Sequence, residues 1–162
     1  MTAKVFLKMR AVKLTPVQVR AAQSKDVAKL SGFAEELLQT WNARATTEDA
    51  QRVYERVLRS PDLGIILVAE DKEALCGFAY ASFEWRSEFN GETMDLVELF
   101  VHHSWRNQGV GQTLLNALIT QARRRNIRRF ACQVHPGNAG IEHALEACGF
   151  DPERRTVWGL LL

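Results

Sequence analysis

Proline, cysteine and long apolar runs are all scarce in this chain, which has four prolines and three cysteines among 162 residues. The longest apolar stretch, residues 63–69, is far shorter than the ~20 residues that a membrane-spanning helix requires. Residues 1–15 lack the apolar core of a secretory signal. The net charge of +2 is too small to favour a nucleic acid or a membrane surface as partner. We therefore expect a cytoplasmic protein without a membrane partner.

The cysteines and histidines do not form a recognisable metal site. Each of Cys76, Cys132 and Cys148 lies in an apolar segment, and no two of them form a Cys-x-x-Cys pair. Such cysteines are typical of buried free thiols in a reducing compartment. His102 and His103 are adjacent instead of being spaced to share a metal, and no further ligand cluster accompanies them. We expect no bound metal.

What the sequence does contain is the composition of an ordinary globular domain, with 46% hydrophobic and 25% charged residues. At this length a single domain buries a sufficient core without disulfides or metal. We expect one domain over residues 16–162, preceded by an extension over residues 1–15. In that extension basic residues alternate with apolar ones, which fits either an additional strand or an irregular tail.

Apolar periodicity predicts strands and helices that follow one another along the chain. Strand-like segments cover residues 17–20, 64–70, 76–85, 96–101, 129–134 and 156–162, and helical spacing starts near residues 27, 47, 110 and 138. The second helix opens with two threonines followed by Glu48 and Asp49, which is typical of a capped N-terminus. The order indicates a mixed α/β domain whose central strands are covered on both faces.

The most informative segment joins a predicted strand to a predicted helix through a glycine-containing turn. Residues 96–101 are predicted to form the strand, residues 106–111 form the turn, and apolar residues from Val110 onward repeat at helical spacing. A helix that begins in this way presents unpaired N–H groups and the positive end of its dipole at one point. Glycine lets a ligand approach the main chain closely. The segment therefore predicts an anion-binding site.

Two common phosphate-binding motifs fail on specific residues of this turn. A Rossmann motif requires a third glycine where this chain has Leu114. A Walker loop requires Lys-Ser or Lys-Thr where this chain has Gln112-Thr113. The remaining pattern is Arg-x-x-Gly-x-Gly between a strand and a helix, and it resembles the pyrophosphate loop of the GNAT N-acetyltransferase family, which binds coenzyme A.

A second segment strengthens this resemblance. Residues 138–150 begin with an asparagine at a helix N-cap position, carry apolar residues on one helical face, and end in Gly149-Phe150. They are similar to the last helix of the same family and follow the loop in the expected order, so the chain is identified as a member of the GNAT family. The resemblance implies a mixed α+β fold, with a central, mostly antiparallel sheet of about six or seven strands and about four helices on both faces.

The resemblance also implies how acetyl-CoA is bound. The pantetheine arm is expected to lie like an added strand beside residues 99–101, where a strand N–H would polarise the thioester carbonyl. The diphosphate is expected on the main-chain amides of the loop, with Arg106 adding charge, and Asn138 is expected to reach the pantetheine. The expected cofactor-binding residues are Leu99, Phe100, Val101, Arg106, Asn107, Gln108, Gly109, Val110, Gly111, Gln112 and Asn138.

Glu98 is the only charged residue in the apolar segment 96–101. A carboxylate in such a strand must be paired, exposed at an opening in the sheet, or partly protonated. One interpretation is a structural ion pair with a neighbour such as Arg86. The other is a catalytic general base that takes a proton from the acceptor amine, a role that an acidic residue of this strand has in many family members.

Leu145 departs from the family pattern. Many members have a tyrosine at this position, seven residues after the asparagine, and it protonates the departing coenzyme A thiolate. Leucine has no proton to give, and His143 lies roughly 200° around the helix from the same face. His135 or a water molecule remains as a proton source, although a thiolate is a fair leaving group near neutral pH.

The acceptor is predicted from local charge. The hairpin expected to border the acceptor cleft is rich in acidic residues, namely Glu84, Glu88, Glu92, Asp95 and Glu98. They favour a cationic amine, either a small molecule or a peptide or protein amine. The sequence leaves the individual acceptor, the acyl chain and a homodimeric state open.

Three functions are consistent with these patterns. The first is an enzyme that moves an acetyl group from acetyl-CoA to a primary amine by direct attack, with Glu98 as the general base. The alternative is a domain of the same fold that binds acyl-CoA without catalysis, as a sensor or partner module. Nucleic-acid binding through the arginines at residues 123–125 and 128–129 has the least support, because that cluster is short and lacks interleaved aromatics. We expect no nucleic-acid partner.

Overall fold

The structure is a computed structural model, and it describes residues 17–135, 138–153 and 155–160. The helices are α1 (Val27–Thr40), α2 (Thr47–Arg59), α3 (Val110–Arg124) and α4 (Ala139–Ala147). The strands are β1 (Gln18–Ala21), β2 (Gly64–Asp71), β3 (Ala74–Arg86), β4 (Gly91–Val101) and β5 (Arg129–Cys132). Short 3-10 turns occupy η1 (Ser24–Asp26), η2 (Ser87–Phe89) and η3 (His103–Trp105). The extension expected over residues 1–15 lies outside the described residues.

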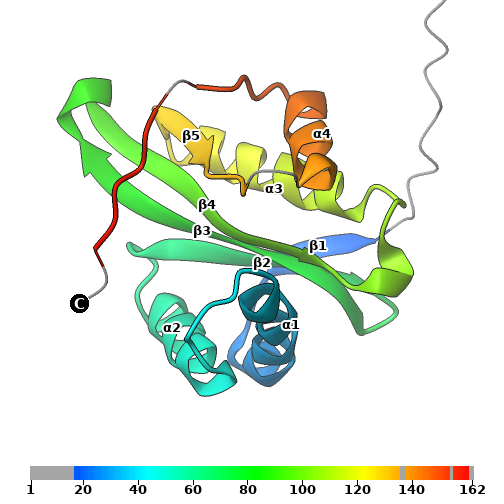
Figure 1. Cartoon of the computed structure of the whole chain (residues 1–162). Helices are drawn as coiled ribbons and strands as arrows, with labels where there is room; N and C mark the ends of the chain where they lie inside the picture. The colour runs from blue at the N-terminus through cyan, green and yellow to red at the C-terminus, as the bar shows by residue number, and fades with distance from the viewer. Residues whose placement is uncertain (1–16, 136–137, 154, 161–162) are drawn as a thin grey trace, which may run out of the picture.

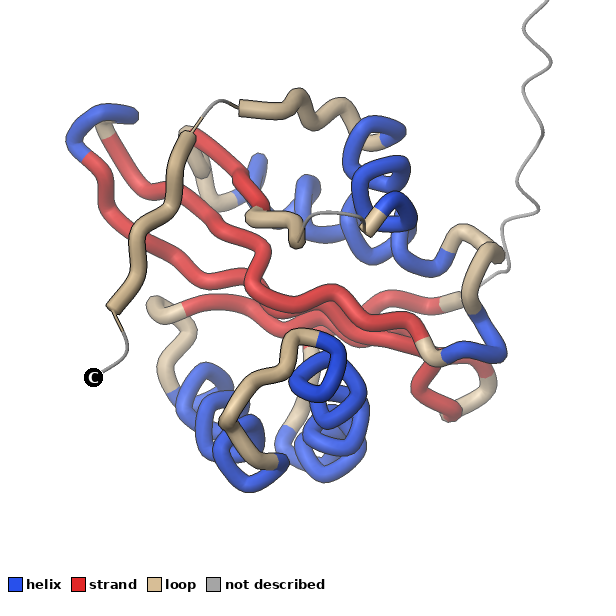
Figure 2. Tube along the Cα trace, viewed as in Figure 1, coloured by secondary structure: helices blue, strands red, loops and turns tan. Residues whose placement is uncertain are grey.

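A five-stranded sheet lies between two layers of helices (Figures 1 and 2), which confirms the predicted mixed fold. The strands follow the chain order from β1 to β5, and every neighbouring pair is antiparallel except β4 and β5, which are parallel. Helices α1 and α2 cover one face of the sheet, and α3 and α4 cover the other. No helix in the described residues has both the length and the apolar character to cross a membrane.

The sheet separates two apolar cores. The core on the α3 and α4 side contains Met94 and Leu96 of β4 together with three leucines of α3. The core on the α1 and α2 side contains Phe33, Tyr54 and Phe100, with the rings of Phe33 and Phe100 stacked at 4.8 Å. Helix α2 begins where the sequence predicts, because Thr46 and Asp49 form the reciprocal hydrogen bonds of a capping box.

One residue of β4 interrupts the alternation of the sheet. Tyr80 of β3 pairs with Glu98 and Ala81 pairs with Leu96, so Val97 is left over as a β-bulge. A bulge shifts the side chains that follow it onto the opposite faces. Leu96 therefore packs against α3 while Glu98, two residues later, lies on the α1 and α2 side with Tyr80.

The strand predicted over residues 156–162 is wrong for the part that the structure describes, because residues 156–160 form no strand. The sheet of the described residues accordingly has five strands instead of six or seven. Arg155, directly before this segment, contacts the β3–β4 hairpin, with its Nη1 atom 3.2 Å from Glu88 and its guanidinium facing the Phe89 ring. Glu153, two residues earlier, pairs with Arg129 of β5 at 2.8 Å, so the segment is fixed by ion pairs of side chains while Trp158 stays exposed.

Candidate active site

The carboxylate of Glu98 is held by a tyrosine from the opposite layer. Tyr54 of α2 is fully buried, and its hydroxyl donates a hydrogen bond of 2.5 Å to Oε2 of Glu98. The structural alternative of an ion pair with Arg86 is not formed, because Arg86 pairs with Glu84 at 2.8 Å and with Glu88 at 3.8 Å. Among the described residues no basic side chain forms an ion pair with Glu98.

Glu98 has the electrostatic environment of a proton acceptor. Burial raises the pKa of its carboxyl above the ordinary value, and the hydrogen bond from Tyr54 offsets part of that rise. Burial and the nearby Glu98 charge in turn raise the pKa of the Tyr54 hydroxyl, so Tyr54 stays protonated and remains a donor. The result is a half-buried carboxylate whose affinity for a proton is higher than that of an exposed glutamate.

Tyr80 lies directly across the sheet from this carboxylate. The two residues are register partners on β3 and β4, which places their side chains on the same face, with Cβ atoms about 5 Å apart. Burial and the Glu98 charge also raise the pKa of the Tyr80 hydroxyl. Glu98 therefore lies between two protonated phenols, one of which donates to it in this structure.

In the ranges that the structure describes, one edge of β4 has no neighbouring strand at the residues that are expected to bind the pantetheine arm. Strand β5 pairs only with residues from Thr93 to Leu96 of β4. No strand in the described part of the chain pairs with Leu99, Phe100 or Val101 on that side. An extended ligand can add to such an edge through main-chain hydrogen bonds. The open edge starts at the bulge, next to Glu98.

The predicted turn leads into α3 at the end of this edge. The chain reverses through η3, Asn107 and Gly109 both adopt left-handed backbone angles (φ of 60° and 81°), and α3 begins at Val110. The first N–H groups of a helix have no partner within it, so the amides of Val110, Gly111 and Gln112 are available to a ligand. Strand edge and helix start are brought together as the sequence predicts.

The two glycines of the motif are not equivalent. Gly109 needs glycine for its backbone, because φ of 81° is a conformation that other residues adopt with strain. Gly111 has ordinary helical geometry, and a Cβ there would meet the side chains of Val101 and Leu99 at 3.7 and 3.9 Å, which is normal contact. Loop shape therefore depends on Gly109 more than on Gly111.

Arg106 and Gln108 are both engaged with the turn itself. The Nε–H group of Arg106 donates to the carbonyl oxygen of Val101 at 2.8 Å, and an Nη2 atom lies 3.5 Å from Glu36. The side-chain amide of Gln108 donates to the carbonyl oxygen of Ser104 at 2.9 Å. In this structure both side chains brace the loop, and their contact with a diphosphate stays a prediction.

The last helix contains the asparagine and leucine that the sequence singles out. Asn138 caps α4, with Oδ1 accepting from the Ile141 amide at 3.5 Å, so its reach to pantetheine stays a prediction. Leu145 is buried in the core beneath α3 and α4 and acts in packing. His135 lies beyond β5, and its ring stacks on that of Trp41 at the end of α1, 5.7 Å between centroids.

Arginines offset most of the negative charge of the β3–β4 hairpin. Glu84 pairs with Arg86, Glu88 with Arg155, Glu92 with Arg125 and Asp95 with Arg129, at 2.8, 3.2, 2.6 and 4.0 Å. Of the five acidic residues that favour a cationic acceptor in the sequence, only Glu98 has no cation beside it among the described residues. The charge of the hairpin therefore favours a cationic acceptor less than the sequence alone indicates.

Two further features of this site are the bulge at Val97, for which the sequence carries a signal, and the Tyr54–Glu98 hydrogen bond, for which it carries none. Met94 and Leu96 belong to the α3-side core at even positions, whereas Leu99 and Val101 pack against the same core at odd positions. This change of parity reveals the bulge at Val97. The Tyr54–Glu98 hydrogen bond joins residues 44 positions apart and has no local signal.

Solved structures with the same fold include several acetyltransferases. A possible acetyltransferase from Clostridium difficile 630 has a TM-score of 0.79 at 16% identity, covering 90% of this chain and 97% of that one. A predicted acetyltransferase from Clostridium acetobutylicum, solved with acetyl-CoA, has a TM-score of 0.75 at 16% identity, covering 89% and 96%. AAC(6')-Iy, in complex with the bisubstrate analog CoA-S-monomethyl-acetylneamine, has a TM-score of 0.74 at 21% identity, covering 91% and 99%.

These structural similarities establish the fold, whereas family membership is established by a match to a sequence model. Among curated protein sequences, none is similar enough to this chain to count as a match. The sequence model of the Acetyltransferase (GNAT) family matches residues 30–150, which include most of α1, all of α2 to α4, the glycine turn and Glu98. The chain therefore belongs to the GNAT acetyltransferase family.

Proposed function

We propose that this protein transfers the acetyl group of acetyl-CoA to a primary amine by direct attack, with Glu98 as the general base. Family membership supports acetyl transfer in general. The observation that supports the specific assignment is the half-buried Glu98 carboxylate, which has a raised pKa and a tyrosine donor and lies where the open edge of β4 begins.

The described residues fit acetyl-CoA. The start of α3 offers main-chain donors to a diphosphate, and the free edge of β4 offers main-chain partners to the amides of a pantetheine arm. Acetyl-CoA, when bound, supplies an activated acyl thioester. An N–H group of β4 near Phe100 or Val101 would stabilise the negative charge that develops on the carbonyl oxygen.

Glu98 would prepare the acceptor for attack. A primary amine with a pKa of about 10 is almost entirely protonated near neutral pH and must lose a proton before its nitrogen can attack. A carboxylate with a raised pKa is a suitable acceptor for that proton, directly or through one water molecule. Tyr54 occupies Oε2, which fixes the carboxylate and leaves Oε1 to face the amine. With Leu145 buried in the core, the thiolate would leave without a tyrosine acid.

Glu98→Gln tests the assignment, because glutamine keeps the shape of the side chain and cannot accept the proton. We expect kcat/KM for the best amine of a panel to fall at least ~10-fold near neutral pH, with unchanged affinity for acetyl-CoA. Glu84→Gln is the matched control, since Glu84 lies on the adjacent strand in an ion pair with Arg86, and its rate should stay at the wild-type value. Unchanged turnover in Glu98→Gln would assign Glu98 to structure alone.

Leu145 supports one other function, a domain that binds acyl-CoA without catalysis. Leu145 is buried and occupies the position where many family members carry the tyrosine that acts as the acid. Release of free thiol from acetyl-CoA in the presence of the amine panel separates the two functions. Micromolar binding of acetyl-CoA with no amine consumed would favour the non-catalytic domain.

A further inference from the structure

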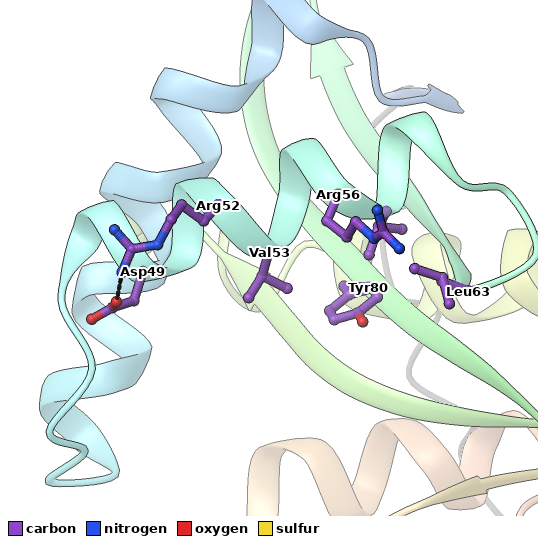
Figure 3. Close-up of a pocket in the computed structure, with 7 residues that line it drawn as sticks. Asp49, Arg52, Val53, Arg56, Leu63 and Tyr80 are labelled. Atoms are coloured by element: carbon purple, nitrogen blue, oxygen red, sulfur yellow. Dashed lines mark hydrogen bonds and ion pairs between the residues drawn. The ribbon is translucent and has the colours of Figure 1, made fainter.

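A pocket of about 540 Å³ opens between α2 and the sheet on the Glu98 side (Figure 3). One wall is the face of α2 that carries Arg52, Val53 and Arg56 at helical spacing, and the floor is Tyr80 of β3. Leu63, in the turn directly before β2, closes the far end. The walls are therefore mainly apolar, with guanidinium groups at the rim.

The pocket adjoins the proposed general base through Tyr80. Tyr80 lines the pocket and is also the register partner of Glu98, on the same face of the sheet. Tyr54, which holds the Glu98 carboxylate, is on the same helix as the pocket wall and lies between Val53 and Arg56 in the sequence. A molecule in this pocket thus contacts Tyr80, which is the cross-strand neighbour of the Glu98 carboxylate.

The charge available in this pocket is positive. Asp49 at its rim is already engaged, because its carboxylate accepts hydrogen bonds from the backbone and hydroxyl of Thr46 and pairs with Arg52. Arg56 has no ion-pair or hydrogen-bond partner among the described residues, and Figure 3 shows its guanidinium extending toward Tyr80 and Leu63. An unpaired guanidinium over an apolar pocket suits a carboxylate, which it binds through two parallel hydrogen bonds.

We propose that the acceptor amine carries a carboxylate, that its apolar body lies against Val53 and Leu63, and that Arg56 binds the carboxylate while the amino group faces Glu98. This inference rests on the proposed acetyl transfer and assigns its acceptor class. Arg56 is then a specificity-determining residue, because it recognises a group that takes no part in the reaction. The paired acidic residues of the hairpin are consistent with this, since their charge is already offset by arginines.

Matched acceptors test the inference directly. Leucine, leucinamide and isopentylamine share one branched body and differ in the carboxylate, and phenylalanine, phenylalaninamide and phenethylamine form a second series. We expect the wild-type enzyme to acetylate at least one amino acid with a kcat/KM at least ~10-fold above that of its amide and its decarboxylated amine. Because these amines also differ in pKa, the decisive quantity is the ratio of variant to wild type for each acceptor.

Arg56→Gln should raise the KM for the carboxylate-bearing acceptor about 10-fold, with little change in kcat, in the KM of the neutral analogues or in the KM of acetyl-CoA. For Arg56→Lys the KM of the same acceptor should lie between those of the wild type and Arg56→Gln, since lysine keeps the positive charge but lacks the planar guanidinium that makes two parallel hydrogen bonds. Arg59→Gln is the matched control, because Arg59 is on the same helix, pairs with Glu55 at 3.9 Å and lies outside the pocket. Arg56 is exposed, so a thermal melt checks that each variant folds.

The possible outcomes separate the two proposals. If amides and simple amines are acetylated as well as the amino acids, and Arg56→Gln changes no KM, the acceptor class is wrong while acetyl transfer stands. If no amine of either series releases free thiol from acetyl-CoA while another amine of the wider panel does, the acceptor class is wrong and acetyl transfer stands. If no amine of the panel does, acetyl transfer fails and the acceptor class fails with it. A carboxylate preference that Arg56→Gln abolishes and Arg59→Gln preserves supports the inference.

Discussion

Tyr54 is the residue that sets the properties of Glu98. Its hydroxyl is buried and stabilises the charged form of the carboxylate, so it lowers a pKa that burial alone would raise further. Tyr54 acts through the Glu98 carboxylate and is a positioning residue. Its removal should therefore change the pH at which the enzyme works as well as its rate.

Tyr54→Phe deletes the donor and keeps the ring in the core. Without the hydrogen bond the pKa of Glu98 rises, so a larger fraction of Glu98 is protonated at neutral pH and unable to act as a base. We expect the acidic limb of the kcat/KM profile to move to higher pH by about one unit, with recovery of the rate at alkaline pH. A pH–rate profile of variant and wild type measures this shift.

Tyr80→Phe is the control for that experiment. It removes a second phenolic hydroxyl near Glu98, and this hydroxyl makes no hydrogen bond to the carboxylate in the structure. The acidic limb should stay at the wild-type pH in this variant, whatever the effect on acceptor KM. A rate loss in Tyr54→Phe that is equal at every pH would show a purely structural role for Tyr54.

At the scale of the element, the turn between β4 and α3 depends on one glycine. Gly109→Ala places a side chain on a residue with φ of 81°, which costs about 1–2 kcal/mol. The strain is relieved by moving the loop, so the amides at the start of α3 no longer converge. We expect a lower midpoint of urea unfolding and a weaker affinity for acetyl-CoA by about 10-fold, measured by calorimetric titration.

Gly111→Ala is the matched substitution two residues later. A methyl group there makes ordinary contacts with Val101 and Leu99, and alanine favours a helix more than glycine does. The unfolding midpoint should be unchanged or slightly higher, with acetyl-CoA affinity near that of the wild type. Equal losses in the two alanine variants would contradict the unequal roles of the two glycines.

Elements with strong local signals could be predicted from the sequence, and those that depend on distant contacts could not. The start of α2 at Thr47 follows from its capping box, and the turn into α3 follows from Gly109 and the apolar spacing after it. Residues 156–160 have the composition of a strand but form none and are exposed, and the residue before them, Arg155, pairs with Glu88, 67 residues earlier. Edge strands require a partner, and local composition does not specify one.

The candidate site divides in the same way. Glu98 stands out in the sequence as a lone charge in an apolar strand, and in the structure no basic side chain of the described residues forms an ion pair with it. The Tyr54 donor and the Arg56 pocket depend on how α2 lies against β3 and β4, which no local pattern encodes. The acidic hairpin shows the limit of composition, because three of its four arginine partners lie elsewhere: directly after α3, in β5 and in the segment after α4.

At the scale of the whole molecule, the sheet separates the two proposed binding regions. The residues expected to hold acetyl-CoA lie at the open edge of β4 and the start of α3, whereas the acceptor pocket lies against α2 on the other face. Glu98 is on β4 and reaches the acceptor face because of the bulge at Val97. The two ligands should therefore protect different segments of the chain from hydrogen exchange.

Hydrogen exchange with mass spectrometry tests this division. Acetyl-CoA at 100 times its Kd should stabilise the bound state by about 2.7 kcal/mol, which slows exchange up to ~100-fold at amides that open locally. We expect this protection in peptides that cover residues 99–112, with no change in peptides from α2 (Thr47–Arg59). A carboxylate-bearing amine added to the protein saturated with coenzyme A, which has no acetyl group to transfer, should then protect α2, and the same amine should fail to do so in Arg56→Gln. Protection of α2 by acetyl-CoA alone, or none in residues 99–112, would contradict the separation of the two regions by the sheet.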